Sequence, residues 1–143
     1  MKRFRFRLQR LLDIKDQIRD EARQELARRN LELAQQESIL RGLQEELGGL
    51  RVKPDGIVTA GELQLTGVYA VRVQQMIEQQ LLMVAQAAKS VTDARERYIQ
   101  ANKEARALEL LQEKKKEEYR EEVLKEEGRQ LDEVATQRAG MKE

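Results

Sequence analysis

Residues 48–61, GGLRVKPDGIVTAG, form the one stretch of the chain that does not look helical. Its glycine pair suits the end of a helix, because glycine adopts the left-handed conformation freely, and KPDG has the composition of a turn. Thr59 and Glu62 have the spacing of a capping box, which marks a helix start. The stretch therefore predicts one helix over about 3–48, a bend over about 49–60 and a second helix over about 60–138.

On both sides of this bend, apolar residues recur every seven positions, as in a coiled coil. They are Leu26, Leu33, Leu40 and Leu47 before it, and Ile77, Val84, Val91, Tyr98 and Ala105 after it. Nearer the N-terminus we expect the stripe to run through Leu8, Leu11 and Ile18, with a stutter between Ile18 and Leu26. The fold class predicted is all-α, a long two-helix antiparallel coiled-coil hairpin.

The position of the bend also predicts the pairing register. If the hairpin folds near residue 57, the numbers of facing residues sum to roughly 115, which places Leu43 near Val73 and Leu8 near Leu108. The second helix then has no partner beyond about residue 115. We expect residues 1–143 to form a single coiled-coil rod whose C-terminal helix overhangs the N-terminus.

Composition excludes several classes of function. The chain has no cysteine and no histidine, so it lacks a thiol nucleophile, an imidazole base and the usual zinc ligands. No phosphate-binding glycine loop is present, and a two-helix rod has no room for a pocket. We expect no enzyme, cofactor, metal or direct small-molecule substrate. With 27 basic and 26 acidic residues, the charge does not favour nucleic-acid binding.

Targeting segments are equally hard to find. No apolar run is long enough for a transmembrane helix, and the N-terminus lacks the apolar core of a secretory signal. The N-terminus is basic and amphipathic like a mitochondrial presequence, but presequences contain few acidic residues, and here Asp13, Asp16 and Asp20 follow closely. A cytosolic protein is the simplest interpretation.

The N-terminus places both phenylalanines of the chain, Phe4 and Phe6, among arginines. On a helix Phe4 shares a face with Leu8 and Leu11, where these side chains would cap the seam, whereas Phe6 points away and is left unexplained. Two alternatives are that this segment binds an anionic membrane or a nucleic acid. Against membrane binding, the apolar face is soon followed by acidic residues. Against nucleic-acid binding, the chain has no row of aromatic residues on which bases could stack.

Two further apolar stripes lie outside the predicted seam. In the overhang, the part of the second helix beyond about residue 115, a thin apolar stripe is formed by Tyr119, Val123, Leu131 and Val134. This part of the helix is either a solvated tail or a surface that binds an external partner. Near the bend, Tyr69, Met76 and Met83 repeat every seven residues, with Ile39 on the first helix. This second stripe is either locally thicker core or an adaptable binding face.

Motifs at the two ends resemble those of one family. The opening F-x-F-x-L-x-x-L-L, formed by Phe4, Phe6, Leu8, Leu11 and Leu12, is similar to that of the flagellar export stalk proteins, the FliJ family. The C-terminal L-D-E-x-A-x-x-R of Leu131–Arg138 is similar too. The resemblance implies a coiled coil like the central stalk of rotary ATPases, cytoplasmic and peripherally associated with the inner face of the cell membrane at the flagellar base.

The same resemblance implies partners and contact residues. The partners are a hexameric flagellar export ATPase, a membrane export-gate protein and export chaperones. The residues facing the ATPase ring would be Phe4, Arg5, Phe6, Arg7, Leu11, Leu12, Leu131, Asp132, Glu133 and Arg138. Those facing the gate or chaperones would be Ile39, Leu43, Tyr69, Met76 and Met83. A generic coiled-coil adaptor, a self-associating rod, a membrane-surface protein and a stalk of a non-flagellar type III secretion system remain alternatives.

Overall fold

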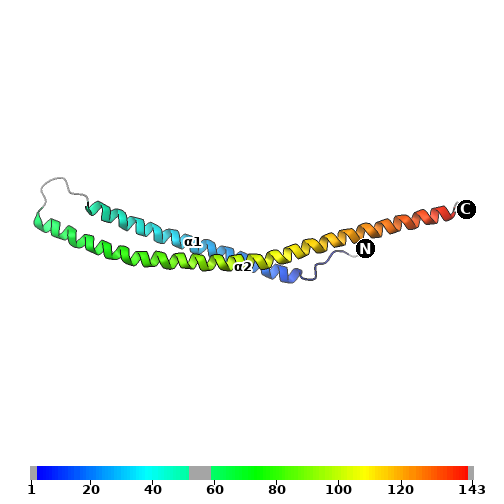
Figure 1. Cartoon of the computed structure of the whole chain (residues 1–143), viewed down its shortest axis with the longest axis horizontal. Helices are drawn as coiled ribbons and strands as arrows, with labels where there is room; N and C mark the ends of the chain where they lie inside the picture. Colours follow the sequence, from blue (N-terminus) through cyan, green and yellow to red (C-terminus); the bar gives the residue numbers. More distant parts are fainter. Residues whose placement is uncertain (1–2, 52–58, 142–143) are drawn as a thin grey trace. The chain divides into compact units, whose positions relative to one another are not determined.

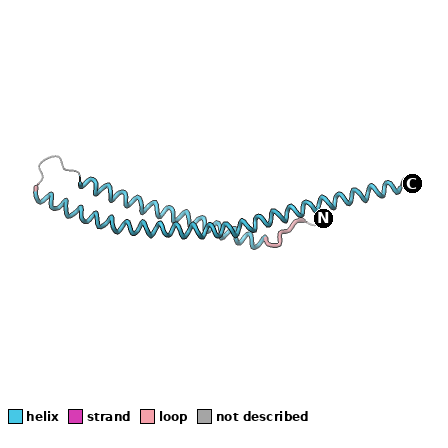
Figure 2. The backbone as a smooth tube through the Cα atoms, in the orientation of Figure 1, coloured by secondary structure: helices cyan, strands magenta, loops and turns pink. Residues whose placement is uncertain are grey.

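The computed structural model of this chain describes residues 3–51 and 59–141 and contains two long helices packed against each other. Helix α1 spans Gln9–Arg51 (43 residues), and helix α2 spans Ala60–Met141 (82 residues). They run antiparallel (Figures 1 and 2), and no strand occurs in these two ranges. The predicted all-α hairpin is confirmed. In the same ranges no helix has the length and apolarity needed to cross a membrane.

Helix α2 begins where the capping box predicts. The backbone N–H of Glu62 donates to the Thr59 hydroxyl at 3.2 Å, and the backbone N–H of Thr59 donates to the Glu62 carboxylate at 3.2 Å. Each side chain therefore satisfies a backbone donor that the helix itself leaves open. The KPDG turn predicted just before this start lies outside the described residues.

Helix α1 differs from the prediction at both ends. It begins at Gln9 rather than near residue 3, and it runs past the glycine pair to Arg51 rather than ending near 48. Extending it backwards would place Arg3, Arg5 and Arg7 at the positive end of the helix dipole, where cations are unfavourable. An extended segment also directs residues 4 and 6 to the same side, which a helix does not.

Residues gather into two compact units, each made from both helices. The hairpin unit contains residues 20–99, and its buried core is Val73, Val91 and Ala94. The terminal unit contains the first 19 residues together with residues from 100 onward, and its core is Leu12, Ala101 and Ala105. Small residues of α2 thus occupy much of both cores, which lets the helices approach closely.

The seam of α1 follows a different course from the predicted one near the N-terminus. Leu11 and Ile18 are each 41% exposed, whereas Leu12 is buried and Arg19 is largely covered. The covered positions Leu12, Lys15, Arg19, Ala22 and Leu26 keep an unbroken heptad spacing. The predicted stutter is therefore wrong, because a cationic side chain occupies the seam position that was assigned to Ile18.

Polar contacts across the helices report the register. In the hairpin unit the Tyr69 hydroxyl donates to Glu46, and the Gln80 amide donates to the Gln36 side chain at 2.7 Å. Both pairs match the predicted sum of about 115. In the terminal unit Gln112 donates to Gln9 at 2.6 Å, a sum of 121, so this contact lies about six residues from the predicted sum.

Candidate functional site

The N-terminal arm, residues 3–8, lies along α2 in the terminal unit. The Phe4 ring stacks on Tyr119 in a tilted geometry, with ring centroids 5.5 Å apart and planes at 53°. Phe6 is also half-buried, and with Leu111 it lines a surface groove of about 860 Å³. Phe6, which a helical N-terminus leaves unexplained, thus lies beside Phe4 on the same groove.

The groove carries charges of both signs. Arg3, Arg5 and Arg7 line it from the arm, and Glu118 and Glu122 line it from α2. All three arginines are exposed, and none forms an ion pair with another described residue. Aromatic rings flanked by exposed guanidinium groups are typical of protein-binding surfaces, because arginine and aromatic residues dominate binding hot spots.

The predicted ring-facing residues do not all meet at this groove. Phe4, Arg5, Phe6 and Arg7 line it, but Leu12 is 7% exposed and belongs to the core, so no partner can reach it. The C-terminal residues Leu131, Asp132, Glu133 and Arg138 are exposed on α2. From Tyr119 to Leu131 the helix rises about 18 Å, so the two motifs form separate surfaces of one unit.

Several residues of the groove were not among the predicted ring-facing residues. Leu111, Lys115, Glu118, Tyr119 and Glu122 line it from α2. Their spacings of three, four, seven, eight and eleven residues place them on one helical face, which is a detectable pattern. Contact between Tyr119 and the arm also extends the paired part of α2 a few residues past the predicted limit of about 115.

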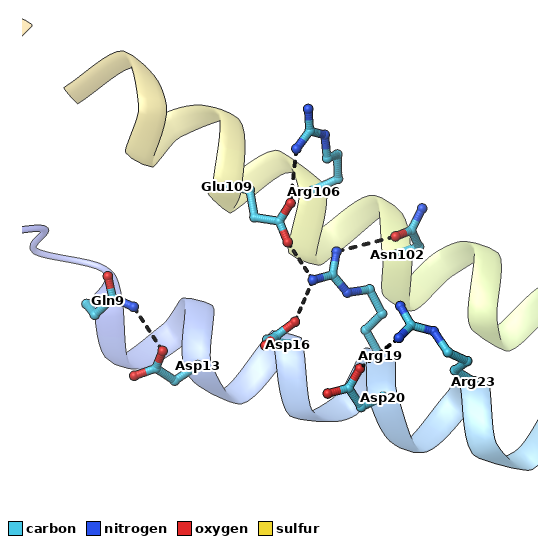
Figure 3. A network of polar contacts seen from close by, with 9 residues as sticks. All are labelled: Gln9, Asp13, Asp16, Arg19, Asp20, Arg23, Asn102, Arg106 and Glu109. Atoms are coloured by element: carbon cyan, nitrogen blue, oxygen red, sulfur yellow. Dashed lines mark hydrogen bonds and ion pairs between the residues drawn. The ribbon is translucent and has the colours of Figure 1, made fainter. Parts of the chain in front are cut away.

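A largely covered arginine, Arg19, joins the two helices of the terminal unit (Figure 3). The Arg19 guanidinium contacts Asp16 and Glu109 at 2.5 Å each and Asn102 at 3.4 Å, and Arg106 also binds Glu109. The hydrogen bonds that Arg19 donates to Asp16 and Glu109 raise the pKa of Arg19, and the bonds that Glu109 accepts from Arg19 and Arg106 lower the pKa of Glu109. We call this set the Arg19 clasp.

A second ion pair between the two helices lies on the side of the seam opposite to the Arg19 clasp. Lys15 Nζ lies 3.0 Å from the Glu104 carboxylate, and this contact, followed by one from Gln100, lowers the pKa of Glu104. On α2, Glu104 and Glu109 project to opposite sides of the buried Ala105. Polar contacts therefore flank the alanine contact on both edges and fix the register beneath the arm.

The clasp predicts acid sensitivity of the terminal unit. Because the folded state lowers the pKa of Glu109 below 4.5, the stabilisation is complete above that value and is lost as the pH falls through the folded pKa. We expect the free energy of unfolding to stay constant from neutral pH to about 5.5 and to decrease below 4.5. Glu109→Gln should flatten this dependence in urea titrations followed by circular dichroism. An equally steep acid dependence in the variant would contradict the assignment.

In the hairpin unit, the residues predicted to face the gate or chaperones lie mostly at the surface. Tyr69, Met76, Met83 and Ile39 are about half exposed, whereas Leu43 is half-buried on the seam. The bond between Tyr69 and Glu46 raises the pKa of Tyr69 and fixes which residues face each other. Met76 lies seven residues after Tyr69 on α2, and Ile39 lies seven residues before Glu46 on α1, so heptad spacing returns both to the same side of their helices. We call Ile39, Tyr69, Met76 and Met83 the edge face.

Comparison with known proteins gives one match. A protein-family model described as Flagellar FliJ protein matches residues 4–143. No curated protein and no solved structure matches the chain. The match covers the arm, both helices and the C-terminal motif. The chain therefore belongs to the FliJ family of flagellar export stalk proteins.

Proposed function

We propose that this chain is a non-enzymatic coupling component of the flagellar type III export apparatus, and that its terminal unit docks into the hexameric export ATPase. The family supports the export role. The observation that carries the docking is the arm, where two half-buried rings lie among three exposed arginines on a groove of α2. Such a surface in the terminal unit favours a protein partner.

Coupling to a ring follows from symmetry. Six equivalent interfaces cannot all make the same contacts with one asymmetric pair of helices. The ring subunits therefore bind the chain unequally, and the chain stabilises some subunit states over others. The arm supplies apolar and cationic groups, and the exposed C-terminal motif supplies Leu131 with both charge signs nearby. Together they would contact different subunits at different depths of the ring.

We propose the edge face as the site for the membrane export gate or for export chaperones. Its methionines are exposed and flexible, and such side chains adapt to more than one partner. This assignment implies a cytoplasmic protein that is peripherally associated with the membrane at the flagellar base. Neither partner surface requires a cofactor.

The docking is tested by the affinity for the purified export ATPase. Phe6→Ala should weaken binding about tenfold, because a half-buried aromatic anchor contributes at least 1.4 kcal/mol to many interfaces. Surface-immobilised ATPase and a concentration series of the chain give the dissociation constant. Leu65→Ala, which truncates an exposed side chain in the hairpin unit, is the matched control and should bind like the unmodified chain.

Folding of both variants is checked by circular dichroism. A helical Phe6→Ala variant with unchanged affinity would contradict the docking proposal. Loss of helicity in the Phe6→Ala variant would show instead that the Phe6 side chain stabilises the fold of the terminal unit.

A further inference from the structure

Two neighbouring rows of side chains on α1 have the spacing of a seam in the terminal unit. The row that lies in the seam, which we call the seam row, consists of Leu12, Lys15 and Arg19. The row beside it, which we call the apolar row, consists of Leu11, Ile14 and Ile18, which are 41%, 50% and 41% exposed. Each member of the apolar row directly precedes a member of the seam row, so both rows have heptad spacing. Exchanging the rows would replace one leucine by another and two cations by two isoleucines.

Arg19 is an unfavourable occupant of a seam position. Its side chain is only 15% exposed, and its Nε–H group is buried without an acceptor among residues 3–51 and 59–141. The ion pairs with Asp16 and Glu109 offset the lost hydration. Replacing such covered pairs by apolar side chains of similar volume is nevertheless often neutral or stabilising. A packing with isoleucine in this place is therefore close in free energy to the one that the structure shows.

The α2 side of the seam accommodates either row. Ala101 and Ala105 are buried, and their methyl groups neither require nor exclude a cation on the facing helix. The pair of Lys15 and Glu104 would open if the rows exchanged, but a pair as exposed as this one contributes little to stability. The choice between the rows therefore depends on the Arg19 clasp.

The rest of α1 need not move when the rows exchange. After the seam row, the next covered positions are Ala22 and Leu26. From Ile18 the same two positions follow in two steps of four residues, which is a stutter that a coiled coil absorbs by local unwinding. A rotation by a fraction of a turn, confined to the start of α1, is therefore sufficient.

We propose that α1, from Gln9 to Arg19, has two packings on α2. In the clasped packing, which is the one described above, the seam row faces α2 and the Arg19 clasp holds it. In the rotated packing the apolar row faces α2 and Arg19 points to solvent. The surface that covers the apolar row is thus α2 of the same chain.

The arm would follow this rotation. It joins α1 at Gln9, whose backbone N–H donates to the Phe6 carbonyl at 3.1 Å, and in the clasped packing it rests on α2 through Phe4 and Tyr119. Rotating its attachment point would lift both rings from the groove. The two packings do not depend on any partner, whereas a switch between a held and a free arm for the ATPase rests on the proposed function.

Alkylation of a thiol in the apolar row distinguishes rotation from unfolding. The chain has no cysteine, so Ile14→Cys introduces a single thiol, and its reaction with iodoacetamide is timed in the purified full chain. Adding Glu109→Ala, which leaves Arg19 without its carboxylate partner on α2, should slow the reaction about tenfold, because the rotated packing then dominates. Unfolding would instead speed the reaction.

Three controls accompany this measurement. Glu113→Ala removes a carboxylate that contacts Arg106 rather than Arg19, and it should leave the rate unchanged. Leu31→Cys, at an exposed position of the hairpin unit, should react equally fast with and without Glu109→Ala. Arg19→Leu, added to the slowed variant, should restore the fast reaction, because the seam row then needs no carboxylate.

Leu12→Lys is a second way to the rotated packing, because it places a charge at the other covered end of the seam row, and it should protect the same thiol. Circular dichroism identifies the variants that remain helical. Alkylation that is not slowed in any helical variant with Glu109→Ala or Leu12→Lys would overturn the proposal. Slowing that Arg19→Leu does not reverse, or that grows with the concentration of the chain, would overturn it too.

Discussion

Ala105→Leu is expected to destabilise the terminal unit by about 1–3 kcal/mol, because it overpacks the point of closest helix contact. Ala105 is 0% exposed, and the Arg19 clasp and the pair of Lys15 and Glu104 lie on either side of it. A larger side chain would push α1 away, and both ion pairs would lengthen as a result. The measurement is urea unfolding followed by circular dichroism.

Ala107→Leu is the matched control for this prediction. It makes the same chemical change two residues away, at an exposed position of the same helix, so helix propensity changes equally. Its effect should be within about 0.5 kcal/mol. Equal effects of the two variants would show that Ala105 is not packed as described.

Met76→Asp is expected to weaken binding to the export gate or chaperone about a hundredfold, which is the largest functional effect we predict. Burying an unpaired carboxylate in an interface costs more than removing a contact, because the charge loses its hydration. Met76 is exposed in the free chain, so the substitution should leave the fold unchanged. The dissociation constants of the purified gate domain and of each export chaperone provide the test.

Gln74→Asp introduces the same charge at an exposed position on the opposite side of α2 and should bind normally. Stimulation of the export ATPase should persist in the Met76→Asp variant. If both gate binding and ATPase stimulation disappear together in a folded variant, the proposal of two separate sites is wrong.

Much of the fold was predictable because it follows from periodicity. Heptad spacing of leucine, valine and alanine defines two helices that pack along narrow stripes, and the capping box of Thr59 and Glu62 fixes where α2 starts. The pairing in the hairpin unit, reported by Gln36 and Gln80, also follows from the position of the bend. These features depend on local spacing, which a sequence displays directly.

The terminal unit was harder to predict because polar side chains and extended backbone decide its structure. A pattern search assigns seam positions to Leu11 and Ile18, yet Arg19 takes the seam because Asp16 and Glu109 neutralise it there. The arm is not helical, and both Phe4 and Phe6 line one groove, which helical periodicity does not reveal.

We propose that the arm couples this chain to the export ATPase. The most direct measurement is ATP hydrolysis by the purified cognate ATPase, titrated with the full chain and with a variant that lacks residues 1–8 but keeps both helices. We predict stimulation by the full chain and its loss in the helical truncated variant. Equal stimulation by both, or none by either, would contradict the account.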